Sequence, residues 1–150
     1  MVTSPPTVEL TAAALSAAID LVANFVETCD PDRYTGEDAA KMVVTFAKAK
    51  RSVTAGQLLF ARRVQKTKLH EQKGHKEVGS WLAGVTGEPV GQATSDMVAA
   101  QMIEAHPEVQ EAFKKGNLSR AQAREIASVA DHSPNEAADL IEDAQKLTFG

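Results

Sequence analysis

The stretch from residue 37 to residue 72 contains no proline and only one glycine, Gly56. Proline breaks the helical hydrogen-bond ladder and glycine weakens it, so this stretch predicts one continuous helix of about 50 Å. Its apolar positions recur every three or four residues, which predicts a seam that packs on another helix. A substitution such as Gly56→Leu on this seam is expected to destabilise the protein by overpacking. The seam consists of Met42, Phe46, Ala49, Val53, Gly56, Phe60, Val64 and Thr67.

A second long helix is predicted over residues 8–29. Its own seam has the same spacing and consists of Leu15, Ile19, Val22, Val26 and Cys29. Pro31 cannot continue the ladder and restricts the residue before it, so the helix is expected to end near Asp30. The two seams predict an antiparallel helical pair. Because the first helix is shorter, the far half of residues 37–72 needs another partner, which the sequence leaves open as the rest of the chain or a second copy.

The remainder of the chain is interrupted by glycine and proline and predicts short helices over 77–85, 90–105 and 107–115, followed by two more. The fourth is expected to begin with Ser119 in a capping box with Gln122, and Leu118 is placed as a hydrophobic staple. The last is expected to open at Ser133-Pro134. No alternating stretch predicts a strand. The sequence therefore predicts an all-α fold, with a long antiparallel helical pair and a compact bundle of short helices. The expected organisation is a disordered lead over 1–7 and one helical domain over 8–150, divided into 8–73 and 77–147.

The net charge of −4 conceals a basic island, since residues 48–76 hold nine bases and only one acid, Glu71. At about 100° per residue, Lys41, Lys48, His70 and several island bases share one helix face. Such a face fits DNA phosphates, whereas a solvated face usually mixes signs. Solvation, or packing against the acidic C-terminal half, remains the alternative. The predicted nucleic-acid-binding residues are Lys48, Arg51, Arg62, Arg63, Lys66 and Lys73.

The residue pattern supplies no catalytic constellation, metal site or cofactor site, so the chain is not expected to be an enzyme. Its one cysteine, Cys29, excludes an internal disulfide and a four-cysteine zinc site. The four histidines show no ligand spacing and are expected at the surface or at helix caps. No signal peptide or membrane-spanning run is present, which predicts a cytoplasmic protein without membrane contact.

A helix-turn-helix-like corner is possible where the helix containing Trp81 and Leu82 is followed by Gly87 and the helix from Val90. Gln92 and Thr94 could read bases in a major groove. However, residues 90–101 contain Asp96 and no base, so repulsion from phosphate argues against this role. The alternative interpretation is a helical corner whose Trp81 and Leu82 fill the core.

The order of motifs over residues 79–144 resembles a known family. Ser80-Trp81-Leu82-Ala83 leads to Thr86-Gly87, and His106-Pro107 leads to Gly116-Asn117-Leu118-Ser119 and then Ala123-Arg124-Glu125-Ile126-Ala127. This is similar to the N-terminal domain of unknown function of 13E12 repeat proteins, which are actinobacterial HNH-endonuclease-like proteins. The same stretch weakly resembles the helix-turn-helix of ParB-type partition proteins, although Glu88-Pro89-Val90 stands where a serine would open the second helix.

The 13E12 resemblance implies a helical accessory domain that precedes a C-terminal HNH nuclease domain in a longer parent protein. The function expected is therefore non-catalytic DNA binding or targeting. The alternative is a protein-interaction or dimerisation module without DNA contact, in which a homodimer forms through the long helix.

Overall fold

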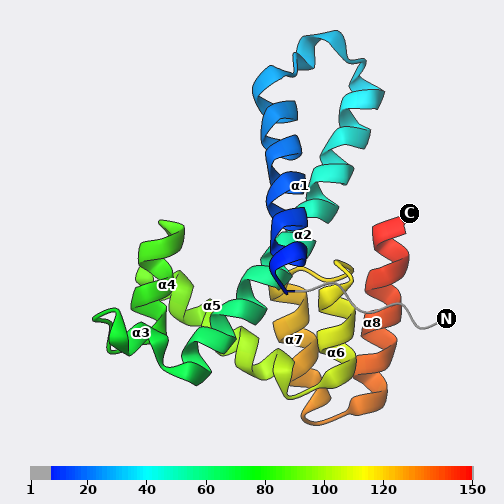
Figure 1. Cartoon of the computed structure of the whole chain (residues 1–150). Helices are drawn as coiled ribbons and strands as arrows, with labels where there is room; N and C mark the ends of the chain where they lie inside the picture. The colour runs from blue at the N-terminus through cyan, green and yellow to red at the C-terminus, as the bar shows by residue number, and fades with distance from the viewer. Residues whose placement is uncertain (1–7, 150) are drawn as a thin grey trace, which may run out of the picture. The chain divides into compact units, whose positions relative to one another are not determined.

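The computed structural model describes residues 8–149, with side chains over 12–146. The expected lead over 1–7 lies outside the described residues. Within the described range the protein is all-α, as predicted, and has no strand (Figure 1). The α-helices are α1 (Val8–Thr28), α2 (Gly36–Thr67), α3 (Leu69–Gln72), α4 (Val78–Thr86), α5 (Val90–Glu104), α6 (Pro107–Lys114), α7 (Arg120–Ala130) and α8 (Pro134–Phe149).

The chain divides into two compact units, Met1–Met42 and Val43–Gly150. The sequence placed a division between the long helices and the short ones, near residues 73–77. The structure places it inside α2, because the later part of α2 contributes Ala55, Leu58 and Ala61 to the same core as the short helices. Most of the longest helix therefore belongs with the bundle.

The first unit contains α1 and a short 3-10 helix, Pro31–Arg33. Asp30 caps the 3-10 helix, since its carboxylate accepts a hydrogen bond of 3.1 Å from the Asp32 amide. The Thr35 hydroxyl accepts one of 3.1 Å from the Asp38 amide and thereby caps the start of α2. The end of α1 and the start of α2 thus lie where the proline and the capping residues predicted them.

Helix α2 continues through Gly56, as predicted, but it ends at Thr67 rather than at residue 72. Lys68 adopts a left-handed conformation with φ of 59°, and the short α3 follows it. Neither glycine nor proline marks this break. Tertiary packing accounts for it, because α3 lies against α4 and buries His70 to 6% exposure. The prediction of one helix to residue 72 is therefore wrong, and so is the expectation that His70 lies at the surface.

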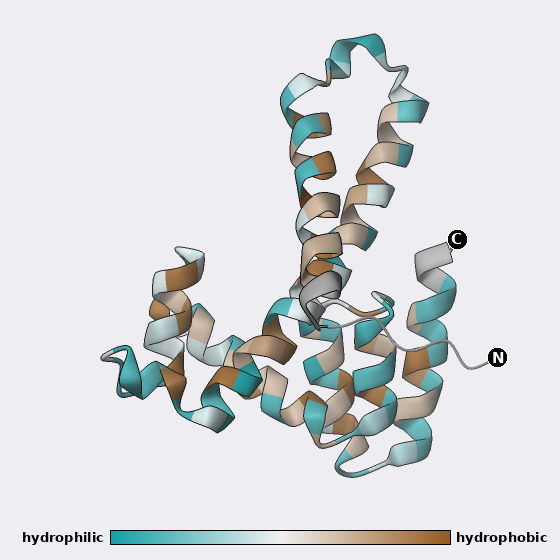
Figure 2. Ribbon diagram, viewed as in Figure 1, coloured by the Kyte–Doolittle hydropathy of each residue, from teal (hydrophilic) through white to brown (hydrophobic). Residues whose placement is uncertain are grey.

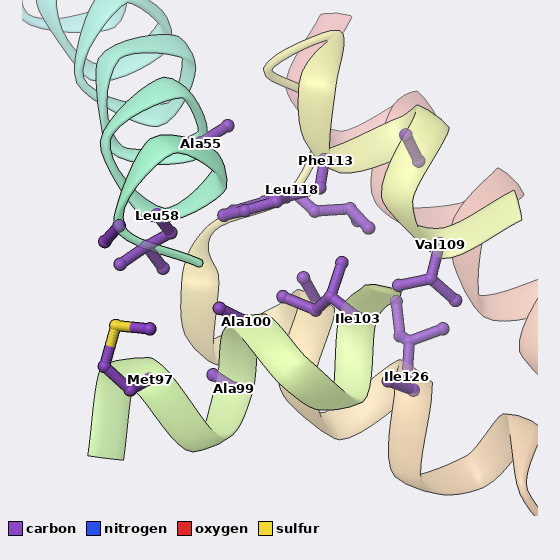
Figure 3. Packing of buried hydrophobic residues seen from close by; sticks show 14 of the residues in the cluster. Ala55, Leu58, Met97, Ala99, Ala100, Ile103, Val109, Phe113, Leu118 and Ile126 are labelled. Atoms are coloured by element: carbon purple, nitrogen blue, oxygen red, sulfur yellow. The ribbon is translucent and has the colours of Figure 1, made fainter. Parts of the chain in front are cut away.

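The seam predicted on α2 is not the face that packs in the bundle. The buried residues are Ala55, Leu58 and Ala61, which lie about 150° around the helix from Val53 and Phe60. Val53 is 61% exposed and Phe60 is 74% exposed. Figure 3 shows Ala55 and Leu58 directed toward the bundle core, where Met97 and Leu118 lie.

A Cβ atom at Gly56 would meet nothing within 4 Å. The overpacking expected from Gly56→Leu therefore finds no close neighbour at the Cβ position among the described residues of the bundle. The exposed apolar positions contribute to the brown segments along α1 and α2 in Figure 2.

The bundle is centred on α5, which packs on α4, α6 and α7, while α8 packs on α7. Helices α4 and α5 approach closely at Gly79, where an added Cβ would lie 3.1 Å from the Thr94 Cα. The largest fully buried side chains are Phe113, Leu58, Ile103, Leu118 and Val109. These residues form one apolar core (Figure 3).

The start of α7 follows its local sequence signals. The Gln122 amide donates to the Ser119 hydroxyl at 3.1 Å, and the Ser119 amide donates to the Gln122 side chain at 2.9 Å, so the predicted capping box is present. Leu118 and Ala123 are both fully buried, as expected for a staple. Gly116, with φ of 76°, supplies the left-handed residue that this turn requires.

Candidate nucleic-acid interface

Arg51, predicted to face DNA, is tied into the bundle. Its Nε donates a 2.7 Å hydrogen bond to the carbonyl of Gly116, and the side chain is half-buried. The turn is close to α2 here, because an added Cβ on Gly116 would lie 2.5 Å from the Ser52 hydroxyl. Arg51 therefore positions the turn before α7. Lys48, one turn earlier on α2, is exposed.

Two further predicted bases, Arg62 and Lys66, converge on Glu104 of α5. Arg62 Nε lies 3.3 Å from one carboxylate oxygen and Lys66 Nζ lies 2.8 Å from the other. Arg62 also donates to Gln65 at 2.8 Å. The hydrogen bond from Lys66, followed by that from Arg62, holds the pKa of Glu104 below its ordinary value of 4.5 despite partial desolvation. These bases join α2 to α5.

Of the six predicted residues, Arg63 and Lys73 are exposed without an ion pair among the described side chains. Because α2 ends at Thr67, Lys73 does not continue the helix face that holds Lys48 and Lys66. The structure therefore divides the predicted stripe into bases bound to the bundle and bases that face solvent.

Exposed lysines gather after the end of α2, and we call Lys68, Lys73 and Lys76 the basic end. All three are exposed, and none forms an ion pair among the side chains of residues 12–146. The site prediction contained only Lys73 of these three. The local excess of bases is visible in the sequence. On the helix predicted to residue 72, however, Lys68 lies off the face that Lys48 and Lys66 share, and Lys76 lies beyond the end of that helix.

The corner formed by α4, Gly87 and α5 binds some of the polar side chains of α5 within the bundle, while Thr94 is exposed. Gln92 donates to Asp96 at 2.9 Å, and Arg120 of α7 donates to the same carboxylate at 2.9 Å. Asp96 is only 5% exposed. Ser95 accepts a 2.7 Å hydrogen bond from Arg124. These contacts bind α5 to α7, and the buried faces of α5 make it the central core helix.

A groove of about 570 Å³ lies between α2, α5 and the start of α7. Lys50, Arg51 and Arg120 line it together with Glu88 and Asp96. Arg120 lies 3.9 Å from Glu88 as well as 2.9 Å from Asp96, so its charge is balanced by these acids. The groove is therefore lined by charges of both signs.

Two histidines outside the predicted interface bond to side chains of neighbouring elements. His106 Nε2 lies 2.7 Å from Asp131, which links the start of α6 to the end of α7. His75 Nδ1 lies 2.9 Å from the Ser80 hydroxyl. Among the described residues no three histidine, cysteine or acidic side chains gather as metal ligands. None of the described helices combines the length and apolar character needed to cross a membrane.

Comparison of the chain with protein-family models, curated proteins and solved structures finds no significant match.

Proposed function

We propose that this chain is a non-catalytic DNA-binding accessory domain of an HNH-endonuclease-like protein, and that the basic end contacts the phosphate backbone. The observation that carries the proposal is the exposure of Lys68, Lys73 and Lys76 within nine residues of chain, without an ion pair among the described side chains. Only Glu71 interrupts the sequence between them with an opposite charge.

Contacts of this kind are electrostatic and read no bases. Each phosphate that a lysine neutralises releases counterions, so three contacts give a log–log salt slope of about −3. Binding is therefore expected to be weak, tolerant of sequence and steeply dependent on salt. Gln92 and Ser95 of α5 support the expectation that bases are not read, because both side chains already have partners within the chain.

The test is fluorescence anisotropy with a labelled DNA duplex at two salt concentrations. The triple variant Lys68→Glu, Lys73→Glu and Lys76→Glu is expected to abolish binding at low salt. The matched control is Lys114→Glu, Lys115→Glu and Lys146→Glu, which changes the net charge equally at exposed lysines elsewhere. Equal loss in both variants, or no binding by the wild type, would overturn the proposal.

A second pair of substitutions separates backbone binding from groove reading. Gln92→Ala with Thr94→Ala is expected to leave DNA affinity nearly unchanged. If this pair abolishes binding while the basic-end variant binds normally, α5 is the recognition element and the proposal is wrong.

A protein-interaction module without DNA contact is the second candidate function. The observation that favours it is the exposure of large apolar side chains, with Phe60 at 74%, Leu21 at 73% and Val53 at 61%. This function predicts association that persists at high salt, because apolar burial is not screened.

A further inference from the structure

A pocket of about 330 Å³ lies between the end of α2, the start of α4 and the side of α5. Its apolar lining comes from Val78, Met97 and Val98. Small-molecule sites have volumes in this range and combine apolar walls with a few polar groups that fix the orientation of the ligand.

The polar lining of this pocket includes three side chains that are available to a ligand. Glu77, Thr94 and Gln101 are exposed, and none of them forms an ion pair or a side-chain hydrogen bond within residues 12–146. Gln92 and Ser95 of the same helix α5 are different, because their side chains bond within the bundle. The pocket therefore gathers polar groups that the fold itself does not use.

These polar groups match the pairing edge of cytosine. The ionised carboxylate of Glu77 can only accept hydrogen bonds, and a carboxylate of this kind accepts from the amino group of cytosine. The Gln101 amide and the Thr94 hydroxyl can donate to the ring nitrogen and the carbonyl oxygen beside it. Thymine has a carbonyl oxygen in place of the amino group, so two acceptors would face each other at Glu77.

The pocket adjoins the basic end. Lys76 precedes Glu77 in the chain, so their Cα atoms are about 3.8 Å apart. A DNA strand whose phosphates contact the basic end therefore runs beside the residues that line the pocket.

We propose that this pocket takes one unpaired base of a single DNA strand whose backbone lies on the basic end, and that it prefers cytosine to thymine. This inference rests on the proposed function, because the basic end supplies the backbone contact. In a single strand the bases are free to turn toward the protein, whereas in a duplex they are paired and stacked. Duplex binding therefore remains tolerant of sequence, and the pocket adds affinity for single strands.

The experiment compares labelled oligo(dC) and oligo(dT) of equal length by fluorescence anisotropy, at mildly alkaline pH and one salt concentration. The wild type is expected to bind oligo(dC) about fivefold or more tightly than oligo(dT). Glu77→Ala is expected to bring the ratio of the two dissociation constants close to one. The side chain of Glu77 makes no capping bond to α4, so the substitution leaves the start of that helix intact.

The matched control is Glu71→Ala, which removes the same charge from an exposed position between the lysines of the basic end. It is expected to strengthen the binding of both oligonucleotides and to leave their ratio unchanged. Gln101→Ala is expected to weaken oligo(dC) binding and to leave duplex binding unchanged. Circular dichroism confirms that each variant is folded.

The outcomes separate this inference from the proposed function. Equal binding of oligo(dC) and oligo(dT) by the wild type overturns the inference, and so does a preference that survives Glu77→Ala. If duplex binding by the basic end persists in either case, the DNA proposal stands. If neither the duplex nor the oligonucleotides bind at low salt, both proposals are wrong.

Discussion

Helices α2 and α5 differ in how much of each helix is buried. The 32-residue α2 buries three residues, all alanine or leucine, and leaves Phe60 74% exposed. The 15-residue α5 buries six residues, including the charged Asp96. The Phe60 ring is therefore exposed to water while the Asp96 carboxylate is buried. Helix α5 is surrounded by other helices, and Arg120 of α7 donates a hydrogen bond to Asp96. The later part of α2, in contrast, packs on the bundle on one side only. Burial here follows the position of neighbouring helices more closely than the polarity of the residue.

The largest expected effect separates the two faces of α2. Leu58→Ala is expected to lower the free energy of unfolding by about 2–5 kcal/mol, because Leu58 is 2% exposed and its loss leaves a cavity. Phe60→Ala, two residues away, removes more atoms but is expected to cost well under about 1 kcal/mol in the monomer. Urea denaturation of both variants measures the difference. Equal losses would show that α2 packs on its predicted seam.

Substitution of Gly79 or Gly56 by alanine extends the comparison of packed and exposed helix faces, because each substitution adds one methyl group. Gly79→Ala is expected to destabilise the protein by about 1–3 kcal/mol, because the Cβ would be forced against the backbone of Thr94 on α5. Thermal unfolding monitored by circular dichroism measures this effect. An unchanged melting temperature would mean that α4 and α5 are not in close contact at this point.

Gly56→Ala is expected to act in the opposite direction. The added methyl group meets nothing within 4 Å in the chain, and alanine is a better helix former than glycine by about 1 kcal/mol. The melting temperature of the variant at low protein concentration should therefore rise. A fall would place another helix against Gly56 in the monomer.

The smallest expected effect concerns the ionic contact between α2 and α5. Because the pKa of Glu104 is lowered in the folded state, its ionised form stabilises the protein at pH values above its ordinary pKa, and this contribution disappears as pH falls through the lowered value. Glu104→Gln is expected to cost less than about 1 kcal/mol at neutral pH, since the side chain remains 32% exposed.

The pH dependence of this variant provides its own control. The difference in unfolding free energy between wild type and Glu104→Gln should narrow under acidic conditions, below the ordinary pKa of a glutamate. A difference that is constant with pH would show that the effect is one of packing and not of charge.

Local signals predicted the elements that depend on local chemistry. The capping box of Ser119 and Gln122, the end of the helix predicted over 107–115 and the end of α1 before Pro31 were correctly predicted, because each needs only residues within a few positions of chain. The break at Lys68 was not predicted, since no residue there disfavours a helix and the energy that compensates a left-handed lysine comes from packing of α3 on α4.

The candidate nucleic-acid interface was also predicted only as far as local sequence allows. The sequence located the excess of bases between residues 48 and 76, because charge is a property of composition. It could not separate Arg51, Arg62 and Lys66 from Lys68, Lys73 and Lys76, because the partners of the first three are distant in the chain, at Gly116 and Glu104.

By itself, therefore, the sequence determined the helical class, most helix boundaries and the segment that concentrates positive charge, because helix propensity, capping and charge act over short distances. Only the tertiary structure decided which face of α2 packs in the bundle. Ala55, Leu58 and Ala61 permit close approach of the short helices, whereas periodicity alone favours the bulkier Val53 and Phe60. The same choice bound three bases to the bundle and left Val53, Phe60 and the basic end exposed.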